Sequence, residues 1–272
     1  MHKKNWFMFR NSIVVVHERK LLWVFWLLNH LLFQRIKIVY VHHNIFNNHR
    51  FTTILPKTIV AIADRGIENL TKFFGASVKN IHKIYNCVAD EYAGSHAGMN
   101  RERITVLLPG RINSQKQQLD IVKHLSDKLN SRIKTQFAGD GPQLGELKDA
   151  CKGKEAFDVL GFRNDVKDLM TKSDFVLLYS AHEGLPITLI EATMIGMPIV
   201  CNDVGGNAEI CHDGENGWVV NDWDGLREII NNLPSMLDED YVKMCCESRC
   251  VYEQNFTFET FRERYLKLIG SL

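Results

Sequence analysis

The sequence lacks several features that would place it quickly in a structural class. Its 272 residues include only 6 Pro and 18 Gly, which excludes a collagen-like or disordered chain. The 7 cysteines are odd in number and form no Cys-x-x-Cys pair, so they indicate reduced thiols in a cytoplasmic protein. The apolar run 21–33 is interrupted by Asn29 and His30 and is shorter than the roughly 20 residues of a membrane-spanning helix. Residues 1–10 lack an apolar core before a small-residue cleavage site, so no secretory signal is expected.

Acidic residues are scarce in the first part of the chain. Residues 1–100 hold 13 Lys and Arg against 5 Asp and Glu, whereas residues 101–272 hold 20 against 27. A basic half is typical of a protein that approaches something anionic, such as a membrane leaflet, a phosphorylated lipid or a nucleic acid; an ordinary solvated surface is the alternative. Peripheral contact of this half with the inner face of a membrane is one expectation that follows. Because the basic residues are scattered and the second half is acidic, nucleic-acid binding is the least favoured partner class.

Strand patterns alternate with helix patterns along the chain, which predicts an α/β protein with doubly wound parallel sheets. With 45% hydrophobic and 24% charged residues, the chain has the composition and length of two ordinary domains, separated by the polar stretch 91–102. The expected strands are 12–17, 36–41, 58–62, 81–85, 104–108, 133–138, 158–160, 175–179 and 198–202. The expected helices are 19–34, 64–75, 116–130, 142–151, 164–172 and 186–196, followed by further helices to Leu272.

The first predicted strand and helix are strongly apolar. The β-branched run 12–17 predicts a strand buried in a parallel sheet. The helix 19–34 carries Trp23, Phe25 and Trp26 and is apolar on every face, which favours a buried core helix. A membrane anchor is the second interpretation, because basic residues lie close by.

Two glycine turns follow strands in the second half. Gly110, Arg111 and Lys116 come after the strand 104–108, and two cations on one glycine-containing loop suit a diphosphate. The alternative is that both cations are ordinary surface charges. The turn 139–142 lacks the third glycine of a dinucleotide fingerprint and is interpreted as a turn, and Phe162 follows the next strand, where it could face a nucleobase.

The segment SAHEGLPITLIE, residues 180–191, follows a predicted buried strand and opens a helix. The free amides of Leu185, Ile187 and Thr188 would surround the helix N-terminus, which is an inherent anion site. Glu183 and Glu191 could accept hydrogen bonds from sugar hydroxyls on either side of it. The alternative is that Glu183 caps the helix and Glu191 is a solvated charge. A second glycine turn, 203–209, follows the next strand and could contact phosphate or sugar.

These motifs resemble those of the retaining, nucleotide-sugar-dependent glycosyltransferases of the GT-B fold, group 1 (family 4) type. The matching segments are PGRINSQK, FAGDGP, GFRNDVKDLMTKSDFVLLYSAHEGLPITLIEATMIGMPIVCNDVGGNAEI and DGENGWVV, all within residues 104–221. The resemblance implies two Rossmann-like domains, over residues 1–100 and 101–255, with 256–272 as a closing helix that crosses back to the first. It also implies that the first domain lacks its opening strands and helices.

The resemblance also implies a donor site. Arg111 and Lys116 would bind the diphosphate of a UDP- or GDP-sugar. Glu191 would hold the ribose hydroxyls, and Glu183 would contact the transferred sugar beside its reacting carbon. No metal ion or cofactor is expected, since the cations and helix amides would stabilise the departing diphosphate. The donor site would be completed by Gly110, Phe162, Gly184, Leu185, Pro186, Ile187 and Thr188.

The first half matches the family less closely. IKIVYVHHN resembles a strand ending in a catalytic cleft histidine, which would be His42, or His43 if the strand slips by one residue. In IYNC, Cys87 stands where the family has glycine. The expected function is transfer of a sugar, with retention, to a glycan or lipid-linked acceptor in cell-surface polysaccharide synthesis. The alternative is a non-catalytic nucleotide-sugar-binding remnant, or one subunit of a split glycosyltransferase.

Overall fold

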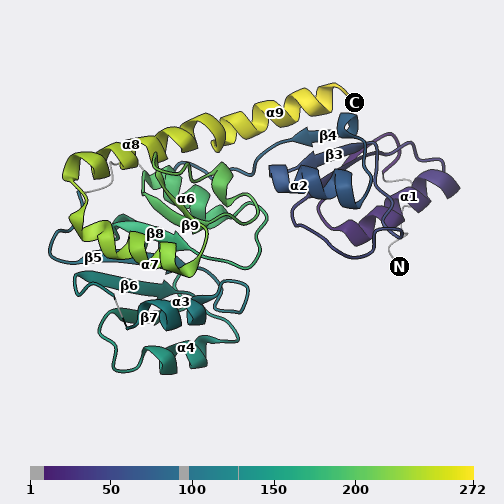
Figure 1. Ribbon diagram of the computed structural model, residues 1–272. Coiled ribbons are helices and arrows are strands. Elements are labelled where there is room, and N and C mark those ends of the chain that lie inside the picture. The colour runs from purple at the N-terminus through teal and green to yellow at the C-terminus, as the bar shows by residue number, and fades with distance from the viewer. Residues whose placement is uncertain (1–8, 92–97, 128) are drawn as a thin grey trace. The chain divides into compact units, whose positions relative to one another are not determined.

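The structure, a computed structural model, describes residues 9–91, 98–127 and 129–272 and divides into two compact units. The first unit comprises residues up to Asn86 together with Glu259–Leu272, and the second comprises Cys87–Phe258 (Figure 1). Residues 92–97 of the predicted boundary stretch lie outside the described residues. The described part of this stretch belongs to the second unit, since Met99 packs in the core of that unit and the amide of Asn100 donates to the carboxylate of Asp174.

The first unit is built on a sheet of four parallel strands in the order β1-β2-β3-β4. Its core forms where Val16, Tyr40 and Ile59 of the sheet meet Leu22 and Leu70 of the helices. Gly75 follows the second helical segment with a left-handed φ of 74°, which glycine accommodates without a steric penalty. The elements are β1 (Ile13–Val16), α1 (Leu22–Leu31), β2 (Lys37–His42), β3 (Thr58–Ala61), α2 (Asp64–Glu68) with its π-helical continuation Asn69–Phe73, β4 (Ile81–Lys83) and α9 (Phe258–Gly270).

Two predictions about this unit are wrong. The strand 12–17 was expected to be buried, but β1 is an edge strand and Ile13 and Val15 are exposed. The helix 19–34 was expected to be core, but α1 buries Leu22 while Trp23 remains 47% exposed. The apolar sequence identified strand and helix correctly, whereas burial depends on what covers each face, which a sequence pattern does not contain.

The second unit contains six parallel strands in the order β10-β9-β8-β5-β6-β7. Helices α3, α4 and α7 cover one face, and α5, α6 and α8 cover the other (Figure 1). The strands are β5 (Ile104–Pro109), β6 (Ile133–Ala138), β7 (Phe157–Gly161), β8 (Phe175–Leu178), β9 (Ile199–Asn202) and β10 (Gly217–Val220). The helices are α3 (Gln118–Leu125), α4 (Leu144–Cys151), α5 (Val166–Thr171), α6 (Ile187–Ile195), α7 (Trp223–Asn232) and α8 (Asp238–Asn255).

Most predicted elements of this unit are present, with shorter helices. The helix predicted from residue 116 begins at Gln118 because Gln117 has a left-handed φ of 51°. The strand β10 was not predicted, since four residues after a glycine turn give too short a pattern to separate from a loop. Among the described residues, no helix combines the length and apolarity needed to cross a membrane.

Candidate functional site

The strand order of the second unit places a switch point between the central strands β5 and β8. The chain runs from β5 to β6 and β7 on one side, and then returns to place β8 on the other side of β5. At such a switch point the loops leaving two neighbouring parallel strands diverge, and ligands bind outside the carboxyl ends between them. Here those loops are 110–117 after β5 and 179–186 after β8, which carry most of the predicted site residues.

Lys116 and Glu183 meet at this switch point. The ammonium of Lys116 lies 2.6 Å from Oε1 of Glu183, and the two side chains are 17% and 8% exposed. The main chains of the two loops also meet, because the amide of Ala181 donates to the carbonyl of Gln115 at 2.8 Å. The Gln115 side chain donates to the carbonyl of His182. The structure therefore joins Lys116 and Glu183, which the sequence analysis assigned as two separate ligands, in one largely buried ion pair beyond the carboxyl ends of β5 and β8.

The glycine turn after β9 supports the loop that holds Glu183. The amide of Gly206 donates to the carbonyl of Gly184 at 2.7 Å. A side chain at Gly205, whose φ is +61°, would stand 2.8 Å from that same carbonyl oxygen. Below the turn, Asn202 bonds both the amide and the carbonyl of Ser180. The sequence analysis did not identify Asn202. A polar residue at the end of a predicted buried strand could have indicated that it supports a neighbouring loop.

Arg111 and Phe162 line an open cavity of about 470 Å³ beside the ion pair. The turn 139–141 forms its floor, where Gly139 and Gly141 pack directly on the backbone of Gly110 and Ile112. Phe162 is 75% exposed, so its ring is available for stacking. A cation, a glycine floor and an exposed aromatic ring suit a flat base joined to phosphate. Lys116, Glu183 and Glu191 are not among the described residues that line this cavity.

Helix α6 follows the loop after β8. Pro186 is its N-cap and Gly196, with φ +77°, ends it, as the sequence predicts. Leu185 and Pro186 are buried, whereas Ile187 is exposed. A proline N-cap has no side-chain acceptor for the first amides of the helix, including those of Ile187 and Thr188. These amides, with the helix dipole, favour an anion.

Glu191 lies on the second turn of α6 and is half-buried. Burial raises the pKa of its carboxyl, and the positive charge of the nearby Lys167 opposes this shift only in part. Lys167 itself pairs with Glu91 at 2.5 Å. Glu191 therefore lies in a less polar environment, where an added hydrogen-bond donor would stabilise its charged form.

His42, the predicted catalytic histidine, lies at the end of β2. Its ring is buried within the first unit, where both ring nitrogens are bonded. Nε2 donates to Asn69 at 3.1 Å, and Nδ1 accepts from the Tyr40 hydroxyl at 3.3 Å. The neighbouring His43 is more accessible, with its Nε2 lying 2.7 Å from Nδ1 of His17.

Burial lowers the pKa of His42 to about 4, and the hydrogen bond to Asn69 only partly opposes this shift. Because the unfolded chain binds the proton more tightly, the free energy of unfolding should fall as pH decreases from about 6.5 towards 4. The loss should be about 3 kcal/mol. Urea unfolding of wild type and His42→Phe at pH 7 and pH 4.5 measures it, with His82→Phe on β4 as control. A ring that titrates near pH 6.5 by NMR would contradict this assignment.

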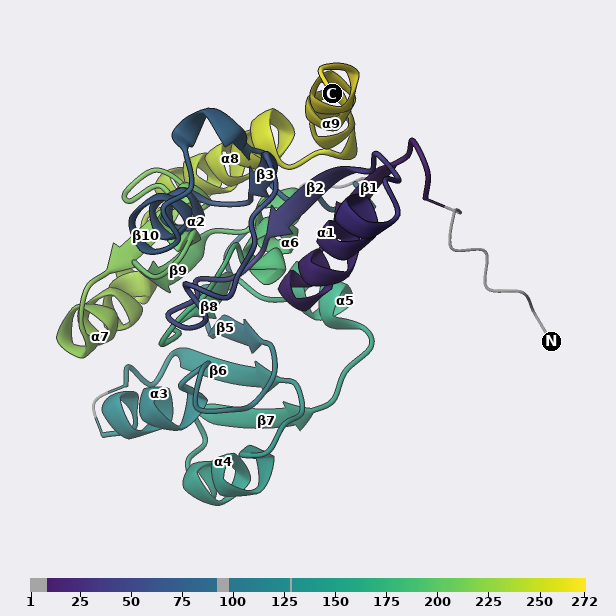
Figure 2. The ribbon, with the colours of Figure 1, turned by 90° about the vertical axis from the view of Figure 1, so that its right-hand side faces the viewer.

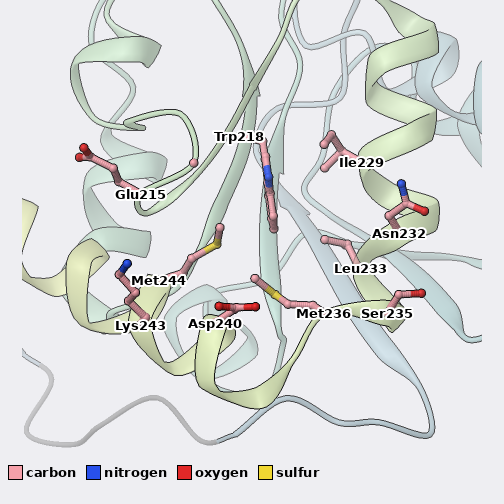
Figure 3. A pocket seen from close by; sticks show the side chains of 11 residues that line it. Glu215, Trp218, Ile229, Asn232, Leu233, Ser235, Met236, Asp240, Lys243 and Met244 are labelled. Carbon is pink, nitrogen blue, oxygen red and sulfur yellow. The ribbon is translucent and has the colours of Figure 1, made fainter.

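A second cavity, of about 520 Å³, lies elsewhere in the second unit. It is lined by residues of β10, α7 and α8, and Figure 3 shows Trp218 between Met244 and Ile229. The cavity adjoins Gly214 and Trp218, at the amino-terminal end of β10, and the last turn of α7. It is therefore at the opposite end of the strands from the β5/β8 switch point, and none of its described lining residues is a predicted site residue.

The chain is similar to known proteins in sequence and in fold. The family model described as "Glycosyl transferases group 1" matches residues 95–241. The chain is 27% identical over 151 residues to the Escherichia coli UDP-Gal:alpha-D-GlcNAc-diphosphoundecaprenol alpha-1,3-galactosyltransferase, covering 52% of this chain and 36% of that protein. It is 25% identical over 223 residues to the Campylobacter jejuni N-acetylgalactosamine-N,N'-diacetylbacillosaminyl-diphospho-undecaprenol 4-alpha-N-acetylgalactosaminyltransferase, covering 78% of this chain and 60% of that protein. The chain thus spans only part of the length of both relatives.

Among solved structures, Anabaena HepE in complex with UDP has a TM-score of 0.84 at 18% sequence identity. The match covers 96% of this chain and 79% of that chain. The lipopolysaccharide outer core galactosyltransferase WaaB has a TM-score of 0.81 at 18% identity, over 96% of this chain and 75% of that one. These similarities confirm the predicted α/β, GT-B-like fold class.

Proposed function

Because the chain belongs to the group 1 glycosyl transferases, we propose that it transfers a sugar from a UDP- or GDP-sugar to a glycan or lipid-linked acceptor, with retention of configuration. The observation that carries the proposal is the Lys116–Glu183 pair, 2.6 Å apart at the β5/β8 switch point. A cation and a carboxylate at that point can hold the two halves of a sugar diphosphate, one by charge and the other by hydrogen bonds to hydroxyls.

Each predicted donor residue takes a role in this proposal. When the bond between the sugar carbon and the diphosphate oxygen breaks, its electron pair leaves with the diphosphate. The acceptor hydroxyl would form the new bond to that carbon on the same face, and its proton would pass to the departing diphosphate. Arg111, Lys116 and the first amides of α6 would stabilise the growing negative charge, so the proposal assigns no step to a metal ion. Glu183 would contact the sugar and Glu191 the ribose hydroxyls, while Phe162 would stack on the base.

The acceptor class is supported by the relatives. The names of the E. coli and C. jejuni proteins specify acceptors linked through diphosphate to undecaprenol. A polyprenyl diphosphate acceptor is therefore the first class to test. Polysaccharide synthesis is consistent with a third relative, the Salmonella typhi Vi polysaccharide biosynthesis protein VipC/TviE, which is 28% identical over 145 residues.

A second candidate function is a subunit that binds nucleotide sugar but needs another chain for transfer. The observation that favours it is β1, which pairs on one side only among the described strands and carries the exposed residues Ile13 and Val15. An unprotected edge strand of this composition invites pairing with a further strand. Donor binding without transfer by the purified chain would select this alternative.

We expect one nucleotide class to stabilise the purified chain against heat. At a hundred times its dissociation constant, a ligand adds about 2.7 kcal/mol to the free energy of unfolding. A thermal-shift panel of UDP, GDP and their sugars measures the effect. Glu191→Ala should lose the shift for nucleotide and donor alike, whereas Glu183→Ala should lose more of the shift for intact donor than for nucleotide.

Glu146→Ala, an exposed glutamate on α4, provides a matched control that should bind as wild type does. Equal shifts in the wild type and both site variants would remove Glu183 and Glu191 from the site. A folded wild type that no nucleotide stabilises would reject donor binding itself.

A further inference from the structure

A side chain joins the ends of β8 and β9 where the main-chain ladder between them stops. The last registered pair of these strands is Leu178 with Cys201, and β9 ends at the next residue, Asn202. The two strands lie side by side in the sheet of the second unit (Figure 2). Oδ1 of Asn202 accepts from the amide of Ser180 at 3.0 Å, and Nδ2 donates to the carbonyl of Ser180 at 2.8 Å. The side-chain amide thus replaces a main-chain peptide group and extends the ladder into the loop that carries Glu183.

The main chain of Asn202 also holds the glycine turn 203–209 beside this loop. Its carbonyl accepts from the side chain of Asn207 at 2.9 Å. Further along the turn, the amide of Gly206 donates to the carbonyl of Gly184 at 2.7 Å. The contacts therefore form a closed ring, which runs from Asn202 along the loop to Gly184, crosses to Gly206 and returns through the turn.

Glu183 lies inside this ring of contacts, one residue before Gly184. Its carbonyl faces Gly205, where a Cβ would overlap the carbonyl oxygen, so the two main chains pack directly on each other. Its carboxylate is held separately by Lys116, 2.6 Å away. The charged end of Glu183 is thus fixed by an ion pair, whereas its main chain is fixed by contacts that begin at Asn202.

Stability alone does not explain the polarity of these buried residues. Oγ of Ser180 and Oδ1 of Asn207 are buried and have no hydrogen-bond partner among the described residues. A buried polar atom without a partner costs stability, so apolar side chains would fill the same places at a lower cost. Proteins keep such unfavourable choices chiefly at functional sites, which indicates that this set of residues serves the donor site.

We propose that Asn202 is a positioning residue of the donor site. It would hold the main chain before Glu183 so that the carboxylate meets the hydroxyls of the transferred sugar. Misplacement of a group by about 1 Å can lower a rate about 100-fold, so a residue that touches no ligand can control transfer. The proposal rests on the proposed function and adds a residue that the predicted donor site does not contain.

Asn202→Ala tests this role first without ligand. Hydrogen exchange of residues 179–186, measured by mass spectrometry, should become about tenfold faster, because the amide of Ser180 loses its acceptor. Asn202→Ser keeps a hydroxyl group in place of the amide and should show a smaller change of the same kind. It replaces Asn202→Ala in every measurement if the alanine variant does not fold.

The same variants are then measured with ligand. Asn202→Ala should bind free nucleotide as the wild type does, but lose about tenfold in affinity for the intact donor. Its kcat for transfer should fall about 10- to 100-fold. Glu183→Ala/Asn202→Ala should lose no more donor affinity than Glu183→Ala, because both changes act through one carboxylate.

Asn216→Ala is the matched control. Asn216 is buried, and its side-chain amide accepts from the amide of His212 and donates to the carbonyl of Ile210. It makes the same pair of contacts at the other end of β9, where its own carbonyl accepts from the amide of Ile199. This variant should lose stability and keep the wild-type difference between donor and nucleotide affinity.

The positioning role is overturned if exchange of residues 179–186 is unchanged, or if Asn202→Ala prefers the donor as the wild type does. Additive losses in the double variant, or an equal loss of donor preference in Asn216→Ala, would also overturn it. In each of these cases the donor site itself remains. A wild type that binds no nucleotide would instead reject the proposed function, and the positioning role with it.

Discussion

Replacing Lys116 with methionine should lower the rate of sugar transfer by about 100- to 1000-fold. Lys116 is the cation nearest to Glu183, and it would neutralise the diphosphate as the bond to the sugar breaks. The variant should also weaken the binding of nucleoside diphosphates more than that of nucleosides. Transfer assays with the donor found by thermal shift, and calorimetry with UDP against uridine or GDP against guanosine, measure the two effects.

The same substitution should affect folding, since it leaves the buried carboxylate of Glu183 without its cation. A loss of about 3 kcal/mol in the free energy of unfolding is expected for Lys116→Met. The double variant Lys116→Met/Glu183→Gln should recover part of it, because no unpaired charge remains. Lys116→Arg keeps the charge, and Lys123→Met removes an exposed lysine from α3 as control. Transfer within twofold of wild type in Lys116→Met would rule out the phosphate role.

Gly139→Ala should lower the free energy of unfolding by about 3 kcal/mol or more. A methyl group at Gly139 would stand 2.8 Å from the carbonyl carbon of Gly110 and closer still to its oxygen. Both strands are held there, since Gly110 donates to Ala138 at 3.0 Å and Gly139 donates to Gly161 at 2.8 Å. The methyl group would meet main-chain atoms of Gly110, so no side-chain rotation relieves the clash. Urea unfolding of the purified variant measures the loss.

Gly145→Ala is the matched control for this substitution. Gly145 lies in α4, where an added methyl group meets nothing within 4 Å. The exchange should leave stability unchanged or raise it by about 0.5–1 kcal/mol, because alanine is the better helix former. If both variants unfolded at the same urea concentration, the close approach of the two loops would be absent in solution. Gly139→Ala should also lose nucleotide binding, since the turn forms the cavity floor.

The alternation of strands and helices could be predicted from the sequence because each element has its own hydrophobic periodicity. The strand 104–108 and the helix 186–196 were placed within a residue or two of β5 and α6, whose proline and glycine boundaries are local signals. By contrast, Ile13 and Trp23 were predicted to be buried and are exposed. Local patterns identify apolar faces, but the elements that cover them are distant in sequence.

The sequence predicted which residues form the candidate site but not how they are arranged in space. Lys116 and Glu183 are 67 positions apart, and only the strand order brings them within 2.6 Å. His42 and His43 could not be distinguished, because a shift of one residue exchanges the two faces of a strand. The structure resolves their placement through Tyr40 and Asn69, which hold His42 inside the first unit.

The first unit is built from two stretches that are far apart in the sequence, and this arrangement should slow its folding. Lys37 donates a hydrogen bond to the carbonyl of Leu272, 235 positions away, and the guanidinium of Arg264 lies over the ring of Tyr85. The second unit is one continuous stretch and closes over shorter spans, such as the 164 positions between Tyr252 and Val88. Because contacts between distant positions form slowly, we expect the second unit to fold first, with the first unit completed only when Glu259–Leu272 joins its strands.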